Sequence, residues 1–76
     1  MPNRAVKLQK TFGETIRHER LARNLTQEAL AEKSELSLNF IGNLERGEKL
    51  PSLDTMVKLA DALGIKVAEL MAKSKL

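Results

Sequence analysis

Apolar residues recur three and four positions apart along most of this chain, and no stretch shows the strict alternation of apolar and polar residues that marks a β-strand. The β-branched residues are scattered rather than gathered into short runs between turn residues, which also argues against strands. The pattern therefore predicts an all-α fold, in which each helix turns one apolar face toward the core.

The first predicted helix has an apolar stripe and a clear end. It is expected to end at Asn24, because asparagine tolerates the left-handed conformation that follows many helices. Its start is left open, since residues 11–14 match a capping box whereas Leu8 would extend the stripe toward the N-terminus. Residues 1–10 are accordingly either a basic arm or an extension of this helix. The stripe consists of Phe12, Ile16 and Leu21.

Hydroxyl residues mark the starts of the next three helices, and glycines mark two of the ends. Thr26, Ser37 and Ser52 can each accept a hydrogen bond from a backbone N–H of the following turn. Gly47 and Gly64 are suited to helix ends. The predicted helices after the first span residues 27–34, 38–46, 53–63 and 67–72. Their apolar faces contain Ala29, Leu30, Ala31, Ile41, Leu44, Leu53, Met56, Ala60, Leu63, Val67, Leu70 and Met71.

The spacing of the second and third helices is the most informative feature of the pattern. Only about three residues separate them, too few for antiparallel packing, so they are expected to cross steeply as in a helix-turn-helix motif. A chain of 76 residues holds one domain, and no linker or repeat divides it. We expect a compact bundle of five short helices, with the main domain over residues 11–72 and a tail over residues 73–76.

Basic residues gather in the first part of the chain. Residues 1–23 carry six Lys or Arg and two Glu, whereas the rest carries seven Lys or Arg and eight Asp or Glu. A basic segment on a near-neutral body suits a polyanionic partner, because Lys and Arg that neutralise phosphates release counterions. A merely solvated face is the alternative.

Several classes of protein are excluded by composition. The chain has no cysteine, so it has neither disulfides nor thiolate metal sites. Charged residues interrupt every apolar run near the N-terminus, and no run approaches the roughly 20 residues of a membrane span. His18, the one histidine, lies among charged residues, and no catalytic or metal constellation can be built around it. We expect a cytoplasmic protein that is not an enzyme and has no small-molecule cofactor and no membrane partner.

Several short motifs occur at fixed spacings over most of the chain. They are Leu25-Thr26-Gln27-Glu28-Ala29-Leu30-Ala31, Ile41, Leu44-Glu45-Arg46-Gly47 and Pro51-Ser52-Leu53, with Ile16-Arg17 and Arg20 upstream and Leu59-Ala60 and Ala62-Leu63-Gly64 downstream. With them the chain resembles helix-turn-helix domains of the Cro and phage-repressor type, which have the lambda-repressor-like fold. In length it is similar to the single-domain controller proteins of restriction–modification systems. The resemblance implies a transcriptional regulator, a repressor or a controller, that binds double-stranded DNA.

The resemblance implies that helix 38–46 lies in the major groove of the DNA. Its outward positions are Leu38, Asn39, Gly42 and Asn43, if Ile41 and Leu44 face the core. Asparagine can bond adenine N6 and N7 together, and leucine can contact a thymine methyl. The expected base contacts are therefore Leu38, Asn39 and Asn43, although the helix alone would favour solvated asparagines. A glycine inside a helix costs about 1 kcal/mol, which a close approach to DNA would justify.

Residues that flank this helix are expected to hold the DNA backbone. Gln27 lies in the first turn of its helix, where free N–H groups and the helix dipole favour an anion, and the resemblance implies that it also braces helix 38–46. The resemblance further implies an ion pair between Arg20 and Glu45, whose bidentate geometry would fix the helices' orientation. The expected phosphate contacts are Thr26, Gln27, Ser37, Arg46, Lys49 and Arg17.

One position departs from the family pattern. The turn between the second and third helices usually carries glycine where this chain has Glu35. If the backbone there keeps a positive φ, a residue other than glycine costs about 1 kcal/mol or more. The turn is therefore expected to differ slightly. Phe40 is expected to pack against the second helix.

The C-terminal part of the chain is expected to form a homodimer. It presents more apolar surface than one short helix can bury on so small a core. A two-fold dimer would place two recognition helices about one DNA turn apart, as a palindromic operator requires. The alternative is that Val67 and Leu70 close the core of the monomer. The expected interface consists of Ile65, Val67, Leu70 and Met71, with Leu76 as a further candidate.

A helical protein-binding module is the alternative function. In that case the chain would act like an antitoxin-type partner, and its DNA binding would be secondary. The fold alone does not decide between the two, because function depends on the site. The polar outward face of helix 38–46 favours DNA over a partner that needs an apolar groove.

Overall fold

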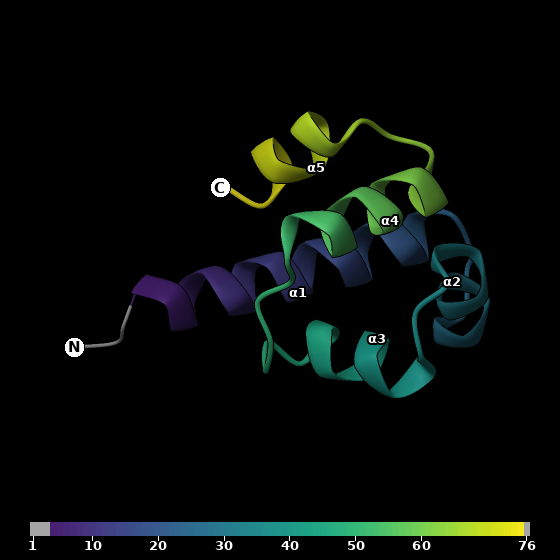
Figure 1. Cartoon of the computed structure of the whole chain (residues 1–76), viewed down its shortest axis with the longest axis horizontal. Helices are drawn as coiled ribbons and strands as arrows, with labels where there is room; N and C mark the ends of the chain where they lie inside the picture. Colours follow the sequence, from purple (N-terminus) through teal and green to yellow (C-terminus); the bar gives the residue numbers. More distant parts are fainter. Residues whose placement is uncertain (1–3, 76) are drawn as a thin grey trace.

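The computed structural model describes residues 4–75 of the chain. Within that range it contains five helices and no strand, so the predicted all-α bundle is confirmed (Figure 1). Residues 1–3 of the expected N-terminal segment and Leu76 lie outside the described residues. The helices are α1 (Arg4–Ala22), α2 (Gln27–Ser34), α3 (Leu38–Glu45), α4 (Leu53–Leu63) and α5 (Val67–Lys73).

Helix α1 starts earlier than the capping-box pattern indicates. It begins at Arg4, so residues 4–10 are an extension of the helix. The capping-box interpretation of residues 11–14 is wrong, because Thr11 lies inside the helix. Its hydroxyl donates a hydrogen bond to the carbonyl oxygen of Lys7 at 3.0 Å.

The other helix boundaries follow the predicted local signals closely. The three hydroxyl caps each accept a hydrogen bond from the backbone N–H three residues further on, at 3.0, 3.0 and 3.2 Å. Asn24 and Gly64 end their helices with positive φ angles of 56° and 73°. Helix α3 ends one residue earlier than predicted, with Arg46 as its C-cap. The caps are Thr26, Ser37 and Ser52.

Two leucines predicted to be buried are exposed instead. Leu21 is 51% exposed and Leu53 is 64% exposed. Leu21 follows Ile16 by five residues, which turns it about 140° around the helix from the buried face. Leu53 is the first residue of α4, one turn before the buried Met56, and lies past the covered part of the stripe. Leu59, which the prediction left out, is fully buried in this helix.

The described part of the chain has one hydrophobic core to which every helix contributes. Burial of each large apolar side chain there stabilises the fold by about 1.5–3 kcal/mol. Phe40 is partly buried and packs against this core, to which α2 contributes Leu30 and Ala31. The core residues are Phe12, Ile16, Leu30, Ala31, Ile41, Leu44, Met56, Leu59, Ala60, Leu63 and Leu70.

Helices α1 and α3 touch at very close range, and this contact sets the position of α3. In Figure 1 the long α1 spans the molecule, with α3 on one side and α4 and α5 on the other. A Cβ atom added at Gly13 of α1 would lie 2.1 Å from the carbonyl oxygen of Leu44. The missing side chain therefore allows the backbone of α1 to lie against the C-terminal end of α3.

The turn between α2 and α3 keeps the left-handed backbone at Glu35, with φ 59° and ψ 32°. The N–H of Leu36 donates to the carbonyl of Ala31 at 3.0 Å, a bond typical of a glycine-type helix end. The left-handed conformation at Glu35 therefore costs about 1 kcal/mol relative to a glycine at this position. The steep crossing of α2 and α3 is preserved (Figure 1).

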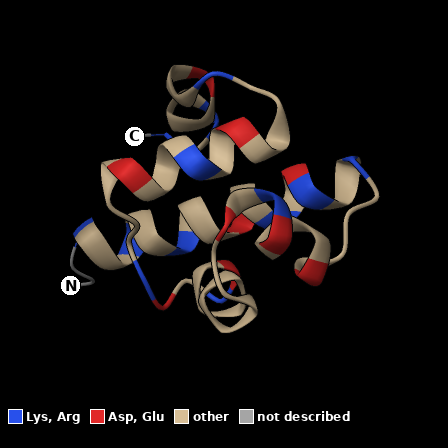
Figure 2. Cartoon of the chain, turned by 45° about the vertical axis from the view of Figure 1, so that its right-hand side comes forward, with Lys and Arg blue, Asp and Glu red and all other residues tan. Residues whose placement is uncertain are grey.

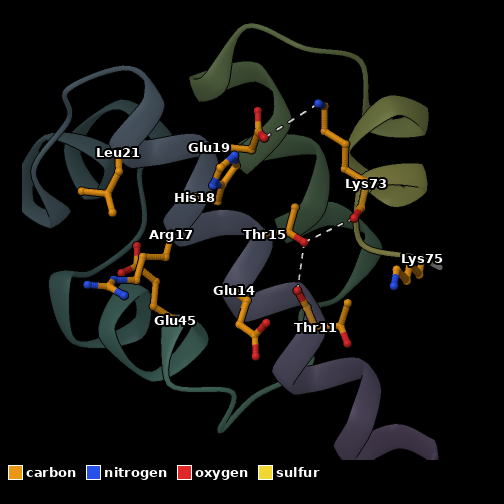
Figure 3. Close-up of a pocket in the computed structure, with 10 residues that line it drawn as sticks. All are labelled: Thr11, Glu14, Thr15, Arg17, His18, Glu19, Leu21, Glu45, Lys73 and Lys75. Carbon is orange, nitrogen blue, oxygen red and sulfur yellow. Dashed lines mark hydrogen bonds and ion pairs between the residues drawn. The ribbon is translucent and has the colours of Figure 1, made fainter.

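Helix α5 closes the core from the other side of α1. Leu70 is fully buried, and Lys73 joins the end of α5 to α1 (Figure 3). Oγ1 of Thr15, which donates to the carbonyl oxygen of Thr11 at 2.9 Å, lies 3.4 Å from the carbonyl oxygen of Lys73, and Nζ of Lys73 lies 3.8 Å from a carboxylate oxygen of Glu19. The helix runs one residue beyond the predicted boundary at residue 72.

Candidate nucleic-acid interface

The outer face of α3 is polar and accessible, while its inner face is fully buried. Ile41 and Leu44 have no exposed surface, as predicted. Leu38 is 47% exposed, Asn39 is exposed and Asn43 is half-buried. Of the three side chains that the sequence indicated as base contacts, Leu38 and Asn39 are therefore exposed in the first turn of α3, and Asn43 is partly accessible in the second turn.

Gly42 does not belong to this open face. It is buried, because the side chain of Arg46 lies over it. A Cβ atom at position 42 would stand 3.1 Å from Nη1 of Arg46. The predicted outward, open position of Gly42 is therefore wrong, and its missing side chain accommodates the guanidinium group of the same helix.

Arg46 links two neighbouring polar side chains. Its Nη2 atom donates to Oδ1 of Asn43 and also lies 3.2 Å from Oε1 of Glu48. Arg46 and Glu48 are both more than half exposed, so each remains open to a ligand. Sequence reasoning missed Glu48 because the loop after α3 decides where that side chain points.

The C-terminal end of α3 is anchored by Glu45, which receives hydrogen bonds from two other helices. Arg20 of α1 donates to both of its carboxylate oxygens, at 2.7 and 3.0 Å. Gln27 of α2 donates to one of the same oxygens at 3.0 Å. Arg20 also donates to the carbonyl of Leu25 at 2.8 Å. One carboxylate thus ties α3 to α1 and to the start of α2.

This ion pair is nearly dry. The side chains of Arg20 and Glu45 are 10% and 4% exposed. The hydrogen bonds from Arg20 to Glu45 raise the pKa of Arg20, and this effect outweighs the opposite effect of burial. Arg20 therefore stays charged throughout the physiological pH range and remains a donor to the anchor of α3.

The predicted phosphate-binding residues flank the outer face of α3. Thr26 and Ser37 cap the two helices of the motif, and both are exposed. Arg17 and Lys49 are exposed as well and form no ion pair within residues 4–75. Gln27 is half-buried, because its amide contacts Glu45.

The charged residues are unevenly distributed around this face. Figure 2 shows cationic segments on the first half of α1, both a cationic and an acidic segment on the loop that follows α3, and acidic segments on α2. The acidic residues of α2 are Glu28 and Glu32, both of them exposed, and Glu35 follows in the turn. A DNA backbone would therefore be attracted to the first half of α1 more than to the body of α2.

An open hollow of about 750 Å³ runs along the exposed side of α1 (Figure 3). Three carboxylates and three basic side chains line it together with His18, so it has no charge preference that would select a ligand. No group of three metal-ligating side chains occurs within residues 4–75. The lining residues are Thr11, Glu14, Thr15, Arg17, His18, Glu19, Leu21, Glu45, Lys73 and Lys75.

The expected dimer surface is only partly available. Leu70 is fully buried in the core of the protomer, so it cannot contact a second chain, and this part of the prediction is wrong. Ile65, Val67 and Met71 pack against the core but remain half-exposed. The described helices include none long and apolar enough to cross a membrane.

Sequence reasoning also missed Arg23, which joins α1 to the end of α4. Its Nε atom donates to the carbonyl of Leu63 at 2.7 Å, and its Nη1 atom forms an ion pair with Glu19 at 3.0 Å. The spacing of Glu19 and Arg23, four residues apart at the C-terminal end of α1, was a signal for the second of these contacts. The first depends on the tertiary structure.

Comparison with known proteins gives consistent results. A family model described as "Helix-turn-helix" matches residues 16–70. The chain is 41% identical over 66 residues to the immunity repressor protein of Bacillus phage phi105, covering 87% of this chain and 46% of that protein. It is 38% identical over 69 residues to the control protein C.SmaI of Serratia marcescens, covering 91% of this chain and 82% of that protein.

Solved structures agree with these relatives. The restriction–modification controller protein C.AhdI from Aeromonas hydrophila superposes with a TM-score of 0.79 at 42% identity, covering 82% of this chain and 94% of that chain. The clp gene regulator ClgR from Corynebacterium glutamicum superposes with a TM-score of 0.83 at 31% identity, covering 90% of this chain and 72% of that chain. The chain spans less than half of the phage repressor and most of the controller proteins.

Proposed function

The chain belongs to the helix-turn-helix family of DNA-binding transcriptional regulators, and on this premise we propose that it binds a palindromic operator as a homodimer, with α3 in the major groove. The observation that carries the proposal is the polar outer face of α3, a helix whose C-terminal end is anchored to α1 and α2 through Glu45. A rigidly held helix with exposed polar side chains can read base edges without first becoming ordered.

The base contacts come from the first two turns of α3. Asn39 supplies an amide that can donate and accept at once, which suits adenine N6 and N7. Leu38 is exposed at the same end of the helix and suits the methyl group of thymine. Asn43 lies one turn further along on the same side of the helix.

Phosphate contacts surround these residues and set the register of the protein on the duplex. Arg17, Arg46 and Lys49 supply positive charge. Thr26 and Ser37 supply hydroxyl groups at the starts of α2 and α3, where the helix dipoles favour an anion. Gln27 has a further role, because its amide also braces Glu45.

Dimerisation would use the apolar surface that remains at the C-terminal end. Ile65, Val67 and Met71 are half-exposed, and a partner that covers them would gain roughly 25 cal/mol for each Å² of apolar surface removed from water. A two-fold arrangement repeats one recognition helix in each half of the operator.

Selection from random-sequence duplexes tests this function. The full chain is expected to enrich a sequence made of two inverted half-sites, and gel shifts on the enriched duplex should show two chains per site. Enrichment of no sequence, or of a single half-site without symmetry, would contradict the proposal. A protein-binding module would give the first of these results.

A further inference from the structure

The side chain of Asn43 is held in one orientation by Arg46. A guanidinium group can only donate hydrogen bonds, so the atom of the Asn43 amide that faces Arg46 must be the oxygen. The bond from Nη2 of Arg46 to Oδ1 of Asn43 therefore fixes which end of the amide is turned away from the arginine. The amino group Nδ2, with its two donors, is the end left for a ligand.

Arg46 is itself held in place from two sides. Its Nη2 atom also lies 3.2 Å from Oε1 of Glu48. The flat guanidinium group covers Gly42, where a Cβ atom would approach Nη1 to 3.1 Å and Cζ to 3.8 Å. A Cβ atom at position 42 would therefore require the guanidinium group to shift slightly.

Backbone hydrogen bonds at the end of α3 place Asn43, Arg46 and Glu48 next to one another. The N–H of Glu48 donates to the carbonyl of Asn43 at 3.0 Å, and the N–H of Gly47 donates to the carbonyl of Leu44 at 3.0 Å. This pair of hydrogen bonds forms a Schellman end of a helix. It returns the chain sharply, so that residue 48 comes back beside residue 43.

We propose that Arg46 is a positioning residue for base recognition: by binding the oxygen of Asn43 it turns the amino group Nδ2 toward the major groove, so that Asn43 prefers guanine over adenine. Guanine offers two adjacent acceptors, N7 and O6, on its major-groove edge, whereas adenine offers one acceptor and one donor. The oxygen of Asn43 keeps a second lone pair, but adenine N6 would have to share that oxygen with the positively charged guanidinium group of Arg46, and this disfavours adenine. This inference rests on the proposed function, because it requires that α3 enters the major groove.

The test compares variants on operator libraries. The Asn43→Ala variant first identifies the base pair that Asn43 reads. It is the operator position at which the wild-type chain has a base preference and the variant has none. At that position the wild-type chain should prefer guanine over adenine by about tenfold. Arg46→Met should reduce this ratio to near one or reverse it, since the released amide can then accept from adenine N6.

Lys49→Met is the matched control. It removes the same charge three residues away, and Lys49 forms no ion pair within residues 4–75. Both variants should weaken binding to random DNA to a similar extent, but only Arg46→Met should change the base preference. Arg46 is more than half exposed and has an ordinary helical backbone, so thermal melting should show that both variants fold. In an Asn43→Ala background, Arg46→Met should have no effect on base preference.

Different results would overturn different parts of the inference. If the wild-type chain prefers adenine at this position, or if Arg46→Met keeps the wild-type preference for guanine, the role assigned to Arg46 is wrong although α3 still reads DNA. If Asn43→Ala keeps the wild-type base preference at every operator position, Asn43 does not contact a base, and the part of the proposed function that places Asn43 in the groove is wrong.

Discussion

At the scale of single residues, Glu45 is the side chain on which the candidate interface depends most. It lies at the last position of α3 and receives three hydrogen bonds from Arg20 and Gln27. Because the side chains of Arg20 and Glu45 are almost fully buried, each charge has lost its water and is compensated by the opposite charge. Removing one charge leaves its partner without compensation in a dry site.

We expect Glu45→Gln to lower the free energy of unfolding by about 3 kcal/mol, as for other buried pairs that lose one partner. Urea denaturation followed by circular dichroism measures this change. Glu48→Gln is the matched control, because the Arg46–Glu48 pair is more than half exposed and should contribute less than about 1 kcal/mol. Similar small losses for both variants would mean that water hydrates the Arg20–Glu45 pair.

Asn39 and Lys49 should separate recognition of sequence from attraction to the DNA backbone. Asn39→Ala is expected to cost about 1–3 kcal/mol on the selected operator and little on random DNA, because it removes a base contact. Lys49→Ala should weaken both kinds of DNA equally and reduce the salt slope by about one for each phosphate that it leaves without a cation. Binding isotherms at two salt concentrations distinguish the two. An Asn39→Ala variant with an unchanged ratio of specific to random binding would show that this side chain is only solvated.

At the scale of the elements, the crossing of α1 and α3 determines where the recognition helix lies. The two helices touch without an intervening side chain at Gly13, where a Cβ atom would stand 2.1 Å from the Leu44 carbonyl. The neighbouring atoms belong to the backbone and cannot rotate away. The ion pair between Arg20 and Glu45 follows two turns later along α1, so one side of α1 positions the whole C-terminal end of α3.

Gly13→Ala should therefore push α1 and α3 apart. We expect a loss of about 1–3 kcal/mol in the free energy of unfolding, as for other overpacked contacts, together with weaker operator binding. Glu14→Ala, at the neighbouring exposed position, should change stability by less than about 0.5 kcal/mol. Thermal melting and gel shifts measure both effects. A Gly13→Ala variant as stable as Glu14→Ala would mean that the helices cross at a greater distance.

At the scale of the whole molecule, the first half of α1 is basic (Figure 2). The half-exposed apolar residues Ile65, Val67 and Met71 lie at the C-terminal end. A polyanion bound at the first region and a second copy of the chain bound at the other would use different parts of the molecule. Because Leu70 closes the protomer core, the proposed dimer surface is smaller than the sequence indicated.

The full chain is expected to sediment as a dimer of 8.5 kDa protomers at micromolar concentration. Met71→Lys should shift it toward monomer, since a charge would have to be buried in the interface. Leu21→Lys, a change at an exposed leucine of α1, should leave the mass unchanged. A wild-type chain that stays monomeric both alone and on the operator would contradict the proposed dimer.

The sequence by itself determined the helices and their order. N-caps such as Ser37 and residues that end a helix, such as Asn24, act on backbone groups within four positions. Their effect can therefore be predicted from the neighbouring residues in the sequence alone. The spacing of α2 and α3 follows from the same signals, and so do the outward positions of Leu38 and Asn39. The partnership of Arg20 with Glu45 was inferred from resemblance to a family, because nothing local joins residues 25 positions apart.

Only the tertiary structure decided how the polar side chains are paired and which apolar residues are covered. Gly42 lies under Arg46, Asn43 is held by the same guanidinium group, and Leu70 belongs to the core. Periodicity shows which side of a helix is apolar, but burial depends on how far the neighbouring helices extend, and Leu53 is exposed for that reason. The orientation of an exposed amide depends on which donor the adjacent loop brings within reach, and the path of that loop is set by packing.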